Sequence, residues 1–547
     1  MPGSIHAKNL PPCAVPAVPV TRATADSGPA DAAAARLVES LARAPASHWL
    51  DLAREHALRG DWRIAETVLR AALARFADDG EVHVALASVL WQAGDADAAR
   101  VLLRDWLQRQ PAHLSAAFTL ARLEGERLDF TAAASALRAA FRHPGQPADL
   151  ALRGAKMLAD WGDKPAAVEI CEAAIAAGSD DPKLHLYAAA LLGQVGDFAR
   201  ARQRYEFALD HDPSAIAAGA AYGLATMQRY VERDNADRQR FEQALLRADL
   251  GNAARASVLF ALGKLHDDLG EFDAAAHCLR QANALVDHGN WSRRNWRRLI
   301  DARLSAKPLP ARTPLADECV PIFVVGAPRS GTTLVAELLG RAPQVVNRGE
   351  LDWLPHLAER VAAAPRVDVA LLDEIAATYL QKLQQGERDA RWFIDKQPLN
   401  FLHLDLIRTL FPQAWILCSR RSERDTALSI WSQHFGSSEY RFAYDFDDIA
   451  AVLRGCDKLM AKAKRAADAR VIEVRYEALA QDPQTIIDGI AATIGLPAFD
   501  CSRADEKRHA IGTASLWQAR QPVYTASIGR WRAYAPFLPE LLGFADD

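Results

Sequence analysis

One segment combines a glycine-framed loop with basic and hydroxyl side chains, which is the residue pattern of a phosphate-binding site. An apolar run at residues 321–325 leads into the loop, and a helical pattern follows it. The glycine, basic and hydroxyl residues of the segment are Gly326, Arg329, Ser330, Gly331, Thr332 and Thr333. A strand that feeds such a loop directs backbone N–H groups and a helix N-terminus at one place, where hydrogen bonds and the helix dipole hold an anion.

The loop lacks one residue that terminal-phosphate transfer requires. Gly326 and Gly331 have the spacing of G-x-x-x-x-G-K-[ST], but Thr332 stands where the lysine that binds the β- and γ-phosphates belongs. A kinase or nucleotidase is therefore the least favoured interpretation. Arg329 supplies a cation instead, and its guanidinium suits a planar anion with several oxygens.

A second segment, residues 415–429, has the pattern of a strand, a basic turn and a helix. Arg421 falls at the end of the strand, and Ser429 follows on the helix. The two side chains can converge on another phosphate, Arg421 through its charge and Ser429 through its hydroxyl group. The pair alone is a weak signal, because arginines at helix starts are usually structural or solvated. Two anion sites on one sheet favour a nucleotide that is phosphorylated at two places.

Together the two segments resemble the 5′- and 3′-phosphate motifs of the sulfotransferases that use 3′-phosphoadenosine 5′-phosphosulfate (PAPS). Further matches, over about residues 318–540, resemble the tyrosylprotein sulfotransferases and their bacterial relatives. They are Glu350, the run Asp395, Lys396, Gln397, Pro398, Leu399 and Asn400, then Tyr476, Glu477, Ser515, Gln518, Pro522, Val523, Arg530 and Trp531.

The resemblance implies a role for each matching residue. The residues that would hold the 5′-phosphosulfate are Arg329, Ser330, Gly331, Thr332 and Thr333. Arg421 and Ser429 would hold the 3′-phosphate, and Tyr476 would lie near the adenine. Ser515 and Arg530 would close over the nucleotide.

Sulfuryl transfer needs a deprotonated hydroxyl acceptor and cations that neutralise the transferred and leaving oxygens, so no metal is required. By resemblance Glu350 is the general base and Lys396 the bridging cation, and Arg329 and Ser515 complete the catalytic set. Without the resemblance, Glu350 would more often be a surface carboxylate, and Lys396 would stand at even odds. Asp395 follows an apolar run as a Walker B acid does, but it is more often structural where the loop lysine is missing.

Two positions depart from the tyrosylprotein enzymes. Gln433 replaces an arginine, which leaves the strength of 3′-phosphate binding open, and Arg530 replaces a lysine, which keeps the charge. Those eukaryotic enzymes are membrane-anchored, whereas no apolar run here reaches the roughly 18 residues of a membrane helix. The acceptor therefore does not follow from the resemblance.

The N-terminal half carries an internal repeat. Aspartates recur at intervals of 34 residues, each followed four residues later by an alanine, and a glycine precedes most of them. These aspartates are Asp61, Asp95, Asp129, Asp163 and Asp197. The pattern resembles the tetratricopeptide repeat, a helix-turn-helix that stacks into a solenoid. One more unit at Glu271 follows Asp197 by 74 residues, which predicts an insertion near residues 227–237.

The expected organisation is a disordered tail at 1–32, a tetratricopeptide-like helical domain at 33–304, a linker at 305–317 and a sulfotransferase domain at 318–547. Strand-like runs at 321–325, 392–394, 414–418 and 470–474 alternate with helical patterns, which predicts a P-loop-like parallel-sheet α/β domain after an all-α solenoid. The basic and aromatic residues 291–298 could face an anionic acceptor, but a capping helix is the commoner use of such a run.

The whole chain bounds the function. It has 547 residues, a net charge of −4 and 7 scattered cysteines without metal-ligand spacing, which disfavours nucleic acid, zinc and disulfides and fits a cytoplasmic protein without a membrane partner. The resulting hypothesis is sulfate transfer from PAPS to a hydroxyl acceptor, a protein or peptide such as tyrosine, recruited by the repeats. A small-molecule or glycan acceptor, and a non-catalytic nucleotide-binding scaffold, remain the alternatives.

Overall fold

The computed structural model describes residues 29–127, 129–314, 319–387, 390–465, 470–503 and 523–545. By its internal contacts the chain divides into two compact units, which meet between residues 180 and 181. Each unit is described by itself. The expected tail at 1–32 lies outside the described residues except at its end, where the first helix already begins at Pro29.

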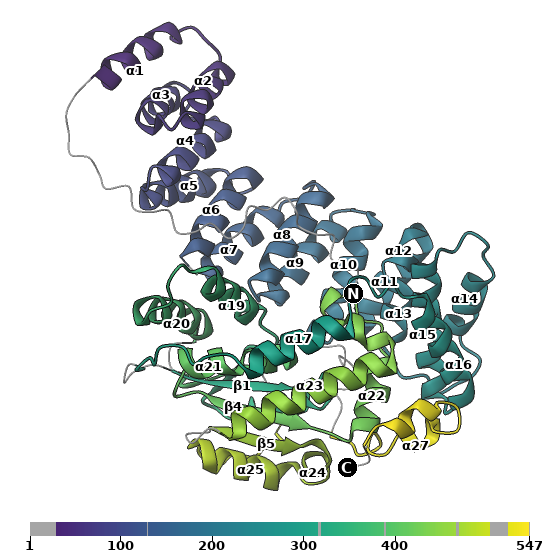
Figure 1. Ribbon diagram of the computed structural model, residues 1–547. Helices are drawn as coiled ribbons and strands as arrows, with labels where there is room; N and C mark the ends of the chain where they lie inside the picture. The colour runs from purple at the N-terminus through teal and green to yellow at the C-terminus, as the bar shows by residue number, and fades with distance from the viewer. Residues whose placement is uncertain are drawn as a thin grey trace. The chain divides into compact units, whose positions relative to one another are not determined.

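The first unit is a series of helices. They are α1 (Pro29–Ser40), α2 (Ala46–Leu58), α3 (Trp62–Arg75), α4 (Gly80–Gln92), α5 (Ala96–Arg109), α6 (Leu114–Glu126), α7 (Phe130–Phe141), α8 (Ala148–Asp160) and α9 (Lys164–Ala176). Consecutive helices pair as α2 with α3, α4 with α5, α6 with α7 and α8 with α9, as Figure 1 shows. This confirms the helical repeats that the sequence predicts.

The recurring aspartates mark the start of the second helix of each repeat. Asp95, Asp129 and Asp163 are the N-caps of α5, α7 and α9, and each carboxylate accepts a hydrogen bond from the backbone N–H three residues on. The alanine that follows each aspartate is fully buried, as at Ala99 and Ala133, because a small side chain lets the paired helices touch. Leu128, where the glycine pattern breaks, lies outside the described residues.

The second unit begins with more repeat helices. They are α10 (Pro182–Val195), α11 (Phe198–His211), α12 (Ser214–Ala217), α13 (Ala220–Ala225), α14 (Ala236–Leu245), α15 (Asn252–Asp268), α16 (Phe272–Leu285) and α17 (Arg293–Leu304). Asn235 caps α14 four residues later than the register of Asp197 requires, and the start of α16 lags by two more. The predicted insertion therefore lies largely in the connection between α13 and α14.

The α/β part contains one five-stranded parallel sheet with the order β2-β3-β1-β4-β5. Its strands are β1 (Val320–Gly326), β2 (Val345–Asn347), β3 (Trp392–Asp395), β4 (Trp415–Arg420) and β5 (Val471–Arg475). Its helices are α18 (Thr332–Leu339), α19 (Trp353–Ala363), α20 (Val369–Gln384), η1 (Pro398–His403), α21 (Leu404–Leu410), α22 (Glu423–Trp431), η2 (Ser438–Tyr444), α23 (Phe446–Lys464), α24 (Tyr476–Gln481), α25 (Pro483–Ile494), α27 (Trp531–Tyr534) and η3 (Pro539–Gly543).

Helices cover both faces of the sheet. Along β1, Ile322 and Val324 pack with α18 and α25 on one face, whereas Phe323 and Val325 pack with α20 to α23 on the other. Burial on both faces explains why the strands are continuous apolar runs in the sequence. Helix α17, the predicted basic and aromatic run, lies along α23 and buries Trp296 there (Figure 1), so it covers the sheet domain.

The last repeats and the α/β part share one apolar core. Phe260 of α15 and Leu279 of α16 belong to the same buried cluster as Trp431 and Tyr444. The contact-based division at 180/181 therefore falls inside the range 33–304 that the sequence assigns to the repeats. The limits 33–304 and 318–547 remain our proposal for where each kind of architecture begins and ends.

Candidate active site

The loop between β1 and α18 has a backbone that few residues other than glycine allow. Gly326 has φ 151°, and a Cβ there would lie 2.5 Å from the carbonyl oxygen of Ser419. Gly331 has φ 100°, and a Cβ there would lie 2.5 Å from the Tyr476 ring. Arg329, with φ 68°, is the one non-glycine with positive φ among the described residues. The loop is thus held tightly between β4 and α24, with the first turn of α18 behind it.

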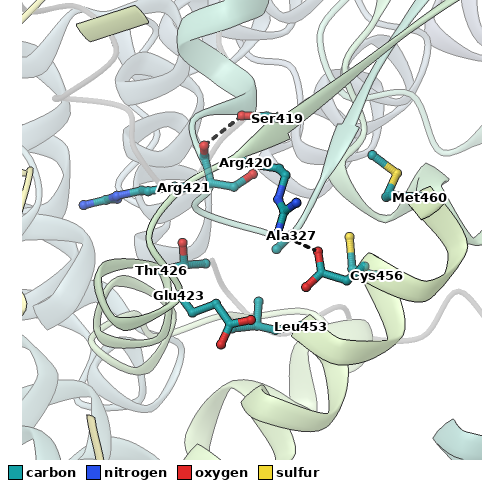
Figure 2. A pocket seen from close by; sticks show the side chains of 11 residues that line it. Ala327, Ser419, Arg420, Arg421, Glu423, Thr426, Leu453, Cys456 and Met460 are labelled. Atoms are coloured by element: carbon teal, nitrogen blue, oxygen red, sulfur yellow. Dashed lines mark hydrogen bonds and ion pairs between the residues drawn. The ribbon is translucent and has the colours of Figure 1, made fainter. Parts of the chain in front are cut away.

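Hydroxyl groups line the inner side of this loop. Ser330 and Thr332 are buried, and Ser419 of β4 donates a 2.7 Å hydrogen bond to the carbonyl oxygen of Ser330. Figure 2 shows the hollow beside the loop, which Ser330, Arg421 and Thr426 help to line. The side-chain oxygens of Ser330 and Thr426 are buried without a hydrogen-bond partner among the described residues. The hollow therefore touches both segments that the sequence assigns to anions.

Arg329 joins those two segments directly. Its Nε donates to Oγ of Ser429, the hydroxyl group on α22 that the sequence assigns to the other phosphate, at 3.0 Å. Burial lowers the pKa of the Arg329 guanidinium, an effect that Tyr222 opposes and neighbouring Arg421 strengthens. A partly buried cation next to another cation is stabilised by a bound anion, so this arrangement favours a phosphate or sulfate.

Arg421 is fixed by backbone carbonyls and an aromatic ring. Its Nη1 donates to the carbonyl oxygen of Arg329 at 3.2 Å, and its Nη2 donates to that of Ser527 at 2.7 Å. The guanidinium lies 4.8 Å from the ring centre of Tyr476. Its Nε–H is buried and has no acceptor among the described residues, so a donor remains for an anionic ligand.

Tyr476 stands at the start of α24, against the loop. Its ring faces Gly331, and its hydroxyl group is hydrogen-bonded to Oγ of Ser527. The structure therefore brings Tyr476 together with the predicted anion-binding residues. A flat ring under an arginine, beside a phosphate loop, can also support a nucleotide base.

Glu350 and Lys396 form an ion pair at the carboxyl edge of the sheet. Glu350 follows β2 and Lys396 follows β3, and these neighbouring parallel strands bring the two side chains to the same edge. Lys396 is 3% exposed at its side chain and Glu350 is 25% exposed, so the carboxylate is accessible and the ammonium is covered. An accessible carboxylate at this edge can take a proton from an incoming hydroxyl group.

Asp395, next to Lys396, has a structural environment. It is fully buried, and it accepts hydrogen bonds from the Tyr379 hydroxyl group at 2.5 Å and from Nδ2 of Asn400 at 3.2 Å. Burial raises the pKa of Asp395 to about 7. These contacts agree with the structural role expected for it.

Two predicted residues from the C-terminal segment stand apart from the cluster. Ser515 lies outside the described residues. Arg530 forms an ion pair with Asp267 of α15, and the structure does not show it on the loop. Ser330, Gly331, Thr332, Arg329, Arg421, Ser429 and Tyr476 come together, and Thr333 lies beside them in the first turn of α18.

Sequence reasoning missed several residues of the site. On α22, Ser422, Thr426 and Ser429 follow each other at helical spacing and form a hydroxyl-bearing face, a signal that was present in the sequence. Tyr222 of α13 donates to Oε1 of Gln433 at 3.0 Å, and no local pattern could have indicated that contact. Gln433, where the tyrosylprotein enzymes have an arginine, is thus bonded to a repeat helix.

No cluster of three or more histidine, cysteine, aspartate or glutamate side chains suited to a metal ion occurs in the described ranges. Among the same residues, no helix is both long and apolar enough to cross a membrane.

Comparison with known families agrees with this geometry. Residues 321–500 match the sulfotransferase family, and residues 50–113 and 118–182 match the tetratricopeptide repeat. The chain is therefore a tetratricopeptide-repeat-containing member of the sulfotransferases.

Two relatives are similar over parts of the chain. An uncharacterized protein of Aquifex aeolicus is 26% identical over 382 residues, covering 64% of this chain and 48% of the relative. Protein-tyrosine sulfotransferase 1 of Danio rerio is 23% identical over 238 residues, covering 39% of this chain and 66% of that enzyme. The chain thus spans about half of the first relative and just under two thirds of the second.

Solved structures with some likeness include the sulfotransferase domain of the Synechococcus PCC 7002 olefin synthase and a sulfotransferase from Mycobacterium tuberculosis H37Rv. The first is 19% identical with a TM-score of 0.30 and covers 44% of this chain and 96% of that one. The second is 15% identical with a TM-score of 0.24 and covers 58% and 97%. Nothing below rests on these two likenesses.

Proposed function

We propose that this sulfotransferase uses PAPS and transfers its sulfuryl group to a hydroxyl group of a protein or peptide. The observation that carries the proposal is the placement of two sets of residues on one parallel sheet. Arg329, Ser429 and Arg421 form a cationic and hydroxyl-lined cluster at the β1 loop, and Glu350 with Lys396 stands at the same carboxyl edge. A twice-phosphorylated nucleotide and a hydroxyl acceptor need these two sets of groups.

The residues of the loop fit the donor in three respects. Gly326 and Gly331 leave room that a Cβ would fill, the Ser330 hydroxyl group is a buried donor without a partner in the described structure, and so is Nε–H of Arg421. The cations supply the charge that the phosphosulfate end and the 3′-phosphate require. Ser515 and Arg530 remain proposed residues of the nucleotide site.

In the proposed reaction Glu350 accepts the proton of the acceptor hydroxyl group. The acceptor oxygen then bonds to sulfur as the bond from sulfur to the 5′-phosphate oxygen breaks, leaving 3′,5′-ADP. Lys396 and Arg329 stabilise the negative charge that develops on the transferred group and on the leaving phosphate. Lys396 already touches Glu350, so base and cation are held side by side before the substrates bind.

A protein or peptide acceptor is supported by the repeats, since such arrays present extended binding surfaces, and by the similarity to a protein-tyrosine sulfotransferase. Acceptor class can be tested with radiolabelled PAPS and three acceptors, namely a tyrosine peptide, a small phenol and a monosaccharide. Label transfer to the peptide that disappears in Glu350→Gln supports the proposal. Transfer to the phenol or the sugar alone points to a small-molecule or glycan acceptor.

The donor is tested by calorimetric titration of the full chain with 3′,5′-ADP, 5′-AMP and ATP. We expect tight binding of 3′,5′-ADP, weak binding of the other two, and loss of the preference for 3′,5′-ADP in Arg421→Ala. Equal binding of 3′,5′-ADP and 5′-AMP by the unaltered protein would exclude the proposed 3′-phosphate site, and PAPS with it.

A further inference from the structure

The last repeat contacts the C-terminal segment that carries Arg530. This segment, residues 523–545, includes α27 and η3 and packs against α22 on one side and against α16 on the other, as Figure 1 shows. Its first part also reaches the site, because the carbonyl oxygen of Ser527 accepts from Arg421 and its hydroxyl group bonds to Tyr476. The segment therefore links the repeat helices to the proposed nucleotide site.

The backbone around Arg530 is fixed from the α/β side. Asp425 of α22 is 1% exposed, and its two carboxylate oxygens accept from the backbone N–H groups of Gly529 at 2.6 Å and Trp531 at 2.9 Å. Gly529, with φ 71°, makes the turn that presents Arg530 between these two bonds. Asp425 thus sets where the Arg530 side chain starts.

The side chain of Arg530 is fixed from the repeat side. Nη2 of Arg530 pairs with Oδ2 of Asp267 on α15, and Oδ1 of Asp267 accepts from the Tyr534 hydroxyl group. The Tyr534 ring in turn packs against Phe272 of α16, with ring centres 5.1 Å apart. Asp267 is therefore held in place by its own neighbours and can orient the guanidinium.

We propose that Asp267, a residue of the last repeat, is a positioning residue for the nucleotide site and acts by orienting Arg530. The inference rests on the proposed function, in which Arg530 closes over the nucleotide. A guanidinium has five N–H donors, so pairing with Asp267 leaves others for an anion. An arginine that is already ordered loses less side-chain entropy on binding, which raises affinity without adding a contact.

The chain offers a matched control at the same interface. Arg280 of α16 pairs with Glu540 at 2.7 Å, so Arg280→Ala breaks another ion pair between the last repeat and the C-terminal segment. That pair does not touch Arg530. An effect found for Asp267 but not for Arg280 therefore reports positioning of Arg530 and not a general loosening of the interface.

The experiment is calorimetric titration of full-length variants with 3′,5′-ADP, together with the KM for PAPS and kcat. Asp267→Asn keeps the shape of the side chain and an oxygen for Tyr534 but removes the charge. We expect its affinity for 3′,5′-ADP to fall about tenfold and the KM for PAPS to rise in parallel, with kcat nearly unchanged. Arg280→Ala should bind as the unaltered protein does.

The double variant Asp267→Asn/Arg530→Ala separates positioning from a merely structural role. If Asp267 acts through Arg530, the double variant binds 3′,5′-ADP no more weakly than Arg530→Ala alone. Additive losses, or unchanged or tighter binding by Asp267→Asn, would overturn the inference. If the unaltered protein itself does not bind 3′,5′-ADP, the proposed function fails; if it binds and Asp267→Asn binds equally, the positioning role alone fails.

Discussion

Replacing Gly331 with alanine tests how the loop is held. The added methyl group meets two obstacles, a backbone φ of 100° and the Tyr476 ring at 2.5 Å. The left-handed backbone costs a residue with a Cβ about 1 kcal/mol, and forcing a methyl group into a filled space costs about 1–3 kcal/mol. We therefore expect the free energy of unfolding of Gly331→Ala to fall by about 2–4 kcal/mol.

Gly94→Ala isolates the backbone cost. Gly94 has φ 92°, in the turn before α5, and a Cβ there would meet nothing within 4 Å. Its substitution should lower the free energy of unfolding by about 1 kcal/mol only. Urea denaturation of both variants therefore measures the contact between Gly331 and Tyr476 as the difference between two similar substitutions.

The same pair of variants separates stability from binding. To accept the methyl group, the loop and the Tyr476 ring must move apart, which shifts the loop's donors relative to Arg421. A displacement of about 1 Å can cost a site about a hundredfold, so we expect 3′,5′-ADP to bind Gly331→Ala ten- to a hundredfold more weakly. Gly94→Ala should bind normally. Equal stability and equal affinity of the two variants would refute the close contact between the loop and Tyr476.

Three further predictions follow from buried or paired groups. Burial raises the pKa of Asp395 to about 7, so the stability gained from its proton is complete below about pH 4 and is lost as the pH rises through 7; Asp395→Asn should remove roughly 2–3 kcal/mol of the pH dependence measured by urea denaturation between pH 5 and pH 8, and parallel curves would contradict this. Lys396→Met should lower the rate of sulfate transfer about a hundredfold or more in a label-transfer assay, and an unchanged rate would remove Lys396 from the mechanism. Phe260, stacked on His434 with ring centres 5.0 Å apart, should cost about 3–5 kcal/mol when replaced by alanine, and a loss below 1 kcal/mol would show that the shared core is not packed as described.

Local signals in the sequence predicted most of the architecture. The aspartate that recurs every 34 residues is an N-cap, and a cap needs only its own side chain and the next three residues. The loop at Gly326 and Gly331 was equally local, since its conformation depends on glycine at fixed places. Strand β2, with three residues, was missed because so short a segment shows no apolar run.

The remaining contacts of the site join residues that are far apart in the chain. Tyr222 and Gln433 are 211 residues apart, and Asp267 and Tyr534 are 267 apart. No periodicity or spacing rule relates such positions, because their contact depends on how the last repeats pack on the α/β part. The sequence could therefore predict which residues bind the nucleotide, but not that Arg530 would be paired with a repeat helix.

The shared core also determines how acceptor recruitment can be tested. A fragment that begins near residue 318 lacks α15 and α16, whose Phe260 and Leu279 pack in the same cluster as Trp431 and Tyr444. Inactivity of that fragment would report a broken core and would say nothing about the acceptor. The helices from α2 to α6 have a core of their own, which includes Trp49 and Trp106. Surface substitutions confined to these helices, in the full chain, are therefore the informative test: they should weaken transfer to a protein acceptor recruited by the repeats and leave transfer to a small phenol unchanged.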